Sequence, residues 1–222
     1  MPCRIIFAIS AALVLAACNA DKSQSPPPTS TSAPAPAAST TAPSTANVPD
    51  KGLKRFHSIR LGFYIDYPAD MTSSVKFDSK YLANDAWKTY APENSTGTSV
   101  LMLTLPDSND VTAGELRIGI SSGDQEVAQC DRPPSNADKN STKTTSINGT
   151  DFTGFHAADA AMNHYLKVHS YRVVHGGYCY AIDLLVTGTN PEVYDPPREP
   201  PFSNKEAFAQ LHKALQGFHF TR

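Results

Sequence analysis

The alternation of apolar and polar residues is most regular in two neighbouring segments, residues 162–174 and 178–187. A two-residue turn at Gly176-Gly177 between them would place Arg172 opposite Ala181. Successive side chains of a strand point to opposite faces, and here both faces carry mainly apolar residues. An antiparallel sheet with one face in water would instead alternate apolar and polar residues. We therefore expect this sheet to be covered on both faces, by helices.

Shorter runs predict further strands in the same part of the chain. Residues 99–105 (SVLMLTL) are almost continuously apolar, which favours a strand buried on both faces, although periodicity alone does not distinguish it from a buried helix. Asn148-Gly149 lies between two β-rich segments and is the strongest short signal for a hairpin. Strands are also predicted at residues 56–59, 62–67 and 114–121.

The C-terminal segment predicts a helix. Ser203 and Glu206 have the spacing of a capping box, in which each side chain bonds the backbone N–H of the other residue. Phe208, Leu211 and Leu215 then follow at helical spacing and form an apolar stripe. Taken together, these patterns predict an α+β fold with a mainly antiparallel sheet that is covered by helices on both faces.

The N-terminal part of the chain has another pattern. Arg4 precedes an apolar run of eleven residues, 5–15, which has the length of a signal peptide and is too short to span a membrane. The run ends in Leu15-Ala16-Ala17-Cys18, which resembles a bacterial lipobox. That resemblance implies that residues 1–17 are a signal peptide, cut off before Cys18, and that Cys18 carries a diacylglycerol. A plain secretory signal is the alternative.

The segment after Cys18 has the composition of a tether. Residues 23–49 contain no charge, and 24 of these 27 positions are Ser, Thr, Ala or Pro. Such a segment cannot bury enough apolar surface to fold. We expect residues 18–50 to be a lipidated cysteine with a disordered tether, and residues 51–222 to be a single globular domain. Asn19 stands where the inner-membrane retention signal of enterobacterial lipoproteins has Asp, which implies the outer membrane of a Gram-negative bacterium, facing the periplasm.

Charge and cysteine usage narrow the class of protein. The formal net charge is −2 and no basic stripe occurs, so a nucleic-acid partner is not expected. Of the four cysteines, Cys3 lies in the signal peptide and Cys18 takes the lipid. Cys130 and Cys179 remain, in a compartment where disulfides persist. One disulfide between them is expected, with free buried thiols as the alternative.

A family resemblance follows from three features. These are a strand that ends in Gly-Phe-x-x-x-x-Pro (Gly62 to Pro68), a strand-dense middle, and a closing helix followed by Phe218-x-Phe220. Together they resemble the PsbP-like α/β/α sandwich superfamily, which includes small bacterial lipoproteins and photosystem accessory proteins. The resemblance implies an accessory or binding role rather than chemistry.

One motif points to catalysis instead. Residues 119–123 (GISSG) match G-x-S-x-G, the nucleophile elbow that exposes a serine between a strand and a helix. Ser121 is therefore the candidate nucleophile of a serine hydrolase. The surrounding pattern argues against this reading, because an α/β-hydrolase requires alternating strands and helices in a parallel sheet, whereas this chain offers hairpins.

Histidines and charged pairs give the remaining candidates. A tight connection centred near Ala160 would place His156 opposite His164, as a pair for a small ligand or a metal ion, although two ligands do not make a structural metal site. Arg172 and Asp183 fall on one face of the hairpin as diagonal neighbours, where we expect an ion pair. No Walker loop, C-x-x-C, H-E-x-x-H or dinucleotide motif occurs, so no cofactor is expected.

The sequence thus favours a lipid-anchored periplasmic protein that is not an enzyme. Its domain is expected to bind an envelope protein or a cell-wall component, and its membrane contact is expected to run through the lipid on Cys18. A hydrolase that uses Ser121 and a ligand or metal binder near His156 and His164 are the alternatives.

Overall fold

The computed structural model describes residues 45–47 and 52–221, which form two antiparallel sheets, the helices α1 (Asp124–Ala128) and α2 (Asn204–Leu215), and the short 3₁₀ helix η1 (Pro191–Val193). The expected signal peptide at 1–17, the lipidation site Cys18 and most of the expected tether at 18–50 lie outside these residues. Within the described ranges, no helix is long and apolar enough to cross a membrane.

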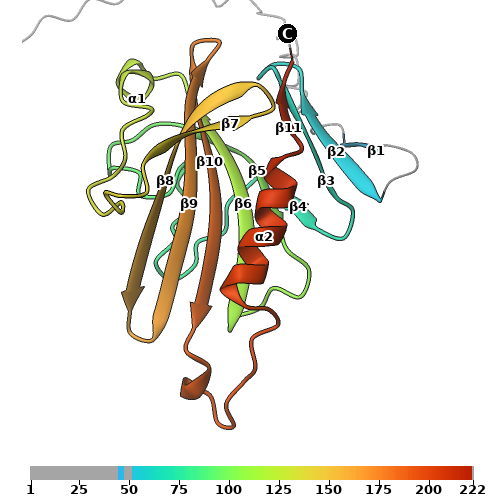
Figure 1. The fold of residues 1–222 in the computed structure, drawn as a ribbon, viewed down its shortest axis with the longest axis vertical. Helices are drawn as coiled ribbons and strands as arrows, with labels where there is room; N and C mark the ends of the chain where they lie inside the picture. Colours follow the sequence, from blue (N-terminus) through green and yellow to red (C-terminus); the bar gives the residue numbers. More distant parts are fainter. Residues whose placement is uncertain (1–44, 48–51, 222) are drawn as a thin grey trace, which may run out of the picture. The chain divides into compact units, whose positions relative to one another are not determined.

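The larger sheet has seven strands in the order β4-β5-β6-β10-β9-β8-β7, and every neighbouring pair is antiparallel (Figure 1). The strands are β4 (Thr72–Ser74), β5 (Thr98–Thr104), β6 (Thr112–Ser121), β7 (Lys143–Ile147), β8 (Thr150–Ala161), β9 (His164–His175) and β10 (Tyr178–Thr189).

The smaller sheet has four strands in the order β1-β2-β3-β11. They are β1 (Thr45–Asn47), β2 (Leu53–Ser58), β3 (Phe63–Pro68) and β11 (Phe218–Phe220). Three residues of the segment expected to be a tether therefore pair with β2. The side-chain amide of Asn148, in the turn between β7 and β8, donates to the carbonyls of Gln216 and Phe218 at 2.8 and 2.7 Å. This contact joins a turn of the larger sheet to the β11 end of the smaller one.

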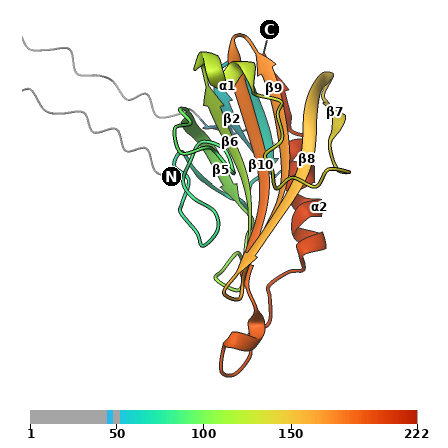
Figure 2. The ribbon, with the colours of Figure 1, turned by 90° about the vertical axis from the view of Figure 1, so that its left-hand side faces the viewer.

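The main core lies between one face of the larger sheet and a layer made of the smaller sheet and α2 (Figures 1 and 2). One continuous buried cluster contains residues from all three elements, among them Phe63, Ile65, Leu116, Ile182, Leu211 and Leu215. Each such side chain contributes about 1.5–3 kcal/mol when it leaves water. The apolar stripe of α2 and the apolar strands are thus buried against each other.

The expectation of helices on both faces is wrong. Helix α2 covers one face, whereas irregular segments, residues 75–97 and the stretch that follows α1, cover the other (Figure 2). Ala83 packs on β9 and β10 there, and Trp87 packs beside Cys179 and Ala181. The chain is therefore not an α/β/α sandwich: it is mostly antiparallel sheet with helical cover on one side.

The charges on that second face explain the irregular cover. Arg117 donates to the backbone carbonyls of Asp78 and Asn84 at 2.8 and 2.7 Å, and the N–H of Thr89 donates to Asp183 at 2.8 Å. A helix uses its interior carbonyl and N–H groups internally, so it has few to offer sideways. An irregular loop has them free, and it supplies Arg117 and Asp183 with hydrogen bonds beyond their buried ion pairs with Glu115 and Arg172.

Several local predictions are confirmed. In the β9–β10 hairpin His175 pairs with Tyr178 and Arg172 with Ala181, as expected for a turn at Gly176 and Gly177, which both have positive φ. The β7–β8 hairpin turns at Asn148-Gly149. Ser203 and Glu206 form the capping box of α2.

The ion pair between Arg172 and Asp183 is also confirmed, with Nη1 and Oδ1 2.7 Å apart and both side chains almost fully buried. Burial by itself would raise the pKa of Asp183. The charge of Arg172, with hydrogen bonds from Arg172, Ser170 and the Thr89 backbone, holds that pKa below its usual value. Asp183 therefore stays ionised inside the protein.

Replacing one partner of this pair should destabilise the protein strongly. Arg172→Met keeps a long apolar side chain but leaves a buried carboxylate without its cation, which costs about 3–5 kcal/mol of unfolding free energy. Chemical denaturation of the full chain measures the loss.

Two further variants control this experiment. Arg172→Met/Asp183→Leu removes both charges and should recover much of the loss, since neither charge has to leave water. Arg198→Met breaks an exposed pair with Asp110, where water screens the charges and the stability should change little. A double variant as unstable as Arg172→Met alone would contradict the account.

Candidate functional site

The irregular cover on the second face encloses a cleft of ≈ 550 Å³. One wall is formed by residues 88–95, and the other by residues 125–135, which include most of α1. Phe155 on β8 and Arg172 on β9 line the cleft from the sheet. The walls therefore belong to loops and the base belongs to the sheet.

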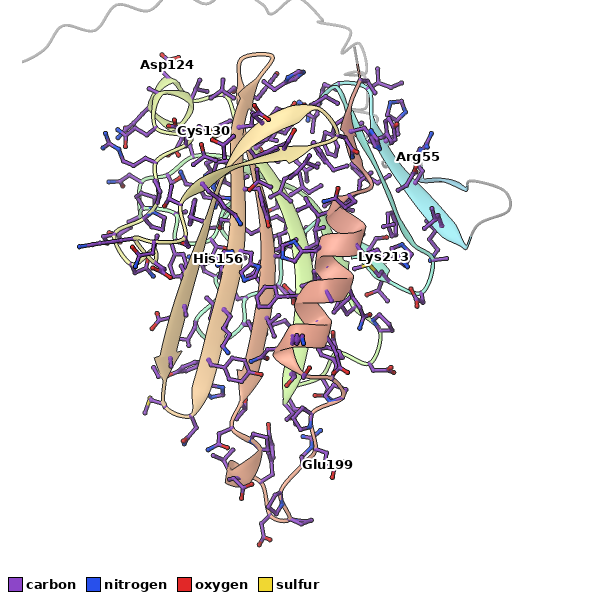
Figure 3. All side chains as sticks on the ribbon, in the orientation of Figure 1. Arg55, Asp124, Cys130, His156, Glu199 and Lys213 are labelled. Atoms are coloured by element: carbon purple, nitrogen blue, oxygen red, sulfur yellow. A yellow bond between two sulfur atoms is a disulfide. The ribbon has the colours of Figure 1, made fainter. Side chains whose placement is uncertain are left out.

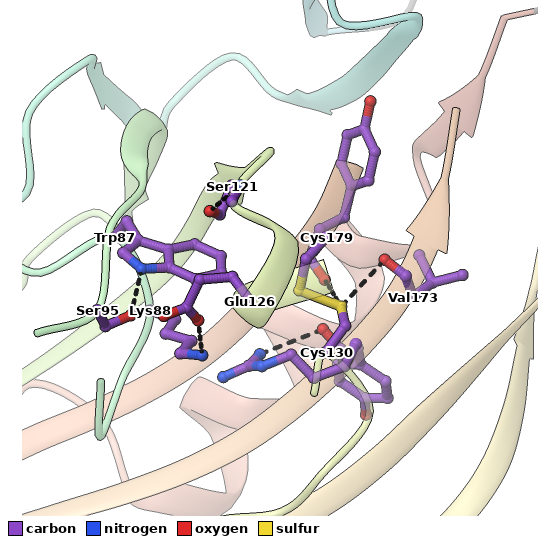
Figure 4. The surroundings of a disulfide bond; sticks show 12 residues. Trp87, Lys88, Ser95, Ser121, Glu126, Cys130, Val173 and Cys179 are labelled. Atoms are coloured by element: carbon purple, nitrogen blue, oxygen red, sulfur yellow. Dashed lines mark hydrogen bonds and ion pairs between the residues drawn. A yellow bond between two sulfur atoms is a disulfide. The ribbon is translucent and has the colours of Figure 1, made fainter. Parts of the chain in front are cut away.

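A disulfide holds the second wall in place (Figure 4). Cys130 lies two residues beyond α1 and is bonded to Cys179 at the start of β10, as the sequence predicts. Both cysteines are buried, and Cys130 itself lines the cleft. A short helix such as α1 is not stable alone, so this covalent link to the sheet fixes its position.

Packing of Trp87 holds the first wall. Its indole N–H donates to the Ser95 hydroxyl at 2.8 Å, which ties together the two ends of this wall. Its backbone lies directly on β6 at Gly119, where any Cβ would overlap the Trp87 carbonyl. Gly97 likewise leaves room for the indole ring. Glycine is required at both positions because the chains approach so closely.

An ion pair joins the two walls. Lys88 Nζ lies 2.6 Å from Glu126 Oε2, and both side chains are largely buried (Figure 4). Burial opposes ionisation of Glu126, but hydrogen bonds from Lys88 and Ser95 and the charge of Lys88 hold its pKa below the usual value. The pair therefore remains charged and bridges the walls at neutral pH.

The base of the cleft presents a guanidinium. Arg172 Nη1 donates to Asp183 and to the Tyr171 carbonyl, and Nη2 lies 3.4 Å from the Ser170 hydroxyl. A guanidinium has five N–H groups. Among the described residues these contacts account for three of them. Arg172 also lies over the ring of Phe155, with Cζ 5.3 Å from the ring centroid.

Ser121 is the last residue of β6 and is buried. Its hydroxyl accepts the backbone N–H of Gly123 at 3.1 Å. The hollow beside it is lined by Arg60, Ile120, Tyr178 and small residues, with no histidine or carboxylate among its described lining. Since Gly119 makes room for Trp87, close packing explains this glycine of G-x-S-x-G. The hydrolase that uses Ser121 stays a prediction.

The structure does not bring His156 and His164 together. The turn between β8 and β9 lies at Met162 and Asn163, both with positive φ, rather than near Ala160. His156 consequently faces His169, while His164 faces Ala161 at the end of the hairpin. His164 instead contacts the Thr189 hydroxyl at 3.0 Å and lies against the tilted ring of Tyr81, with ring centroids 4.1 Å apart.

A different histidine cluster, which the sequence patterns did not predict, forms on the α2 side. The rings of His156, His169 and Phe208 stack in succession, with centroids 3.8 and 3.9 Å apart (Figure 3 labels His156). His169 Nδ1 lies 3.0 Å from His212 Nε2, whose other ring nitrogen lies 3.3 Å from the Tyr171 hydroxyl. Phe208 and His212 are four residues apart on α2, which was the available signal.

The surroundings of this cluster favour the neutral form of its imidazoles. Burial lowers the pKa of His169 to about 3, helped by the nearby His156, His212 and Lys143. The pKa values of His156 and His212 are also lowered, mainly by burial and also by Lys143, with Asp138 opposing the shift at His156. In the described part of the chain, no three His, Cys, Asp or Glu side chains are arranged to hold a metal ion.

The cluster should make the protein less stable in mild acid. Because the folded-state pKa values lie below the ordinary value of 6.5, the unfolded chain takes up protons first. Stability is therefore complete above about pH 6.5 and falls as the pH drops towards the folded values, by at most about 1.4 kcal/mol per pH unit for each histidine. Denaturation between pH 7.5 and 5 measures the slope.

His169→Phe is the matched variant for this measurement, because a neutral ring still stacks between His156 and Phe208. It should have a shallower slope than the wild type over that pH range. An identical slope in both proteins would show that the cluster does not set the acid sensitivity.

Removing the disulfide should loosen the cleft wall. Cys130→Ser opens a loop of about 50 residues, which costs about 4 kcal/mol in the chain-entropy model. For a domain of this size the melting temperature should fall by about 10 °C. Adding a reductant should lower the wild type to the same level and leave Cys130→Ser/Cys179→Ser unchanged; a wild type insensitive to reductant would contradict the prediction.

Comparison with known proteins gives only weak likenesses. No family model and no curated protein matches the chain. A solved structure from Bacteroides thetaiotaomicron is 16% identical with a TM-score of 0.42, over 78% of this chain and 50% of that one, so this chain spans half its length. Cyanobacterial PsbP (CyanoP) from Synechocystis is 10% identical with a TM-score of 0.42, over 80% of this chain and 97% of that one. The PsbP-like resemblance is therefore weak, and no functional argument rests on either likeness.

Proposed function

We propose that this protein is an exported, lipid-anchored module that binds a component of the bacterial envelope without transforming it. The observation that carries the proposal is the cleft of ≈ 550 Å³ whose walls are fixed to the sheet by a disulfide and to each other by Lys88 and Glu126.

Export is supported by the disulfide and by the N-terminal sequence pattern. The disulfide between Cys130 and Cys179 is of the kind that persists outside the cytosol. The lipobox-like Leu15-Ala16-Ala17-Cys18 supports an anchor in the outer membrane, with the domain facing the periplasm. Both features fit one compartment.

Binding is supported by the size and rigidity of the cleft. Its volume falls within the range of about 300–1,000 Å³ that is usual for ligand sites. Walls that are already fixed lose little conformational freedom when a ligand enters, so more of the contact energy appears as affinity. A cleft held in this way suits recognition.

The state of its charged groups favours binding over catalysis. A general acid or base works best with a pKa near the working pH. At this cleft the pKa values of Glu126 and Asp183 are held below their usual values, and each carboxylate is committed to a cation. Both therefore serve as fixed ion-pair partners.

The proposal can be tested by retention on envelope fractions. Full-length protein in mild detergent would be mixed with purified cell-wall sacculi and with immobilised, solubilised outer-membrane proteins. Gln125→Ala/Gln129→Ala removes two exposed amides from the cleft and should reduce retention by at least one fraction about tenfold. Retention by neither fraction, or equal retention of the variant and the wild type, would refute the proposal.

Two controls accompany this test. Gln210→Ala removes an exposed amide from α2, outside the cleft, and should be retained like the wild type. Cys18→Ser should move the protein from the membrane to the soluble periplasmic fraction without a change in melting temperature. A variant that stays with the membrane would remove the lipid anchor from the proposal.

A further inference from the structure

The described lining of the cleft contains no aliphatic hydrophobic side chain other than proline. Among its described residues there is no Ala, Val, Leu, Ile or Met side chain. Its apolar surface comes from prolines, from the rings of Tyr90 and Phe155, and from the disulfide at Cys130. Lipid chains and the aliphatic side chains that anchor peptides are normally held in pockets with aliphatic walls that exclude water. This cleft has no aliphatic pocket to offer them.

The cleft offers paired donors and acceptors instead. Asn94, Gln125 and Gln129 are exposed along its walls, and each side-chain amide presents a donor and an acceptor side by side. Gln125 and Gln129 are four residues apart, so they lie next to each other on the same face of the α1 turn. A hydroxyl group also donates and accepts, which matches such amides.

The charges at the cleft cancel. Lys88 is neutralised by Glu126, and Arg172 by Asp183. Of the other charged residues that line the cleft in the described chain, Arg132 and Glu93 have opposite signs. These groups carry no net charge that would attract a strongly charged ligand. Arg172 itself is almost fully buried at the base of the cleft.

From this lining we infer that the cleft binds an uncharged saccharide, an inference that rests on the proposed binding function. Sugar hydroxyls bond the exposed amides of Asn94, Gln125 and Gln129. The carbon faces of the sugar rings pack on the ring of Tyr90 and on the prolines that line the cleft. Cell-wall glycan and other envelope saccharides both present hydroxyl groups and carbon ring faces. Cell-wall glycan differs in carrying acetamido groups.

Calorimetric titration of the full-length protein in detergent tests the inference with two matched probes. Chitotetraose carries acetamido groups and cellotetraose does not. Binding of either probe is the expected result, with affinity weakened about tenfold by Gln125→Ala/Gln129→Ala, as for the loss of two hydrogen bonds. Gln210→Ala should bind like the wild type. Preference for chitotetraose would indicate that the ligand is cell-wall glycan. Equal binding of both probes would indicate that the cleft accepts envelope saccharides in general.

Two results would overturn the inference. One is that neither tetrasaccharide binds; the other is that one binds but the double variant binds it as tightly as the wild type. If envelope retention still depends on Gln125 and Gln129 while the tetrasaccharides fail, only the saccharide inference falls and the proposed function stands. If retention fails as well, both fall. Equal melting temperatures of the variants and the wild type ensure that a loss reflects the cleft rather than the fold.

Discussion

The buried ion pair between Arg172 and Asp183 is the constraint on which the second face of the larger sheet depends. Two charges that leave water must be paired and hydrogen-bonded, or the fold loses several kcal/mol. Asp183 obtains its remaining partners from Ser170 and from the backbone of residue 89. Neighbouring Arg117 likewise needs the carbonyls of Asp78 and Asn84. This face is therefore covered by irregular backbone, whose free N–H and carbonyl groups bond these charges.

The cleft follows from that requirement. A loop is attached to a sheet at separate points, here at Trp87, at residue 89 and through the disulfide of Cys130, rather than along a continuous stripe. Space remains between the points of attachment, and the bridge from Lys88 to Glu126 keeps that space open and rigid. Stability and the proposed binding function thus use the same contacts.

The opposite face follows different physics. Helix α2 closes it by apolar burial, with Leu211 and Leu215 in the main core and Phe208 on the ring of His169. The histidines there are held neutral by burial, so this face contributes sensitivity to acid rather than a charged site. The two faces of the larger sheet thus have different roles. The face under α2 contributes most of the core, and the loop-covered face forms the base of the candidate site.

The sequence by itself determined the local features. The β9–β10 register, the turn at Asn148-Gly149, the capping box of α2 and the Cys130–Cys179 pair follow from turn chemistry, spacing and elimination, because the partners are close in the chain or have no competitor. Only the tertiary structure decided the second sheet, the loop cover, the cleft and the His156–His169–His212 cluster. These depend on contacts between distant segments. Because the β8–β9 turn lies at Met162 and Asn163 rather than near Ala160, His156 faces His169 instead of His164. Hydrogen bonds from Arg117 to backbone carbonyls, which no side-chain pattern records, favour the irregular cover of the charged face.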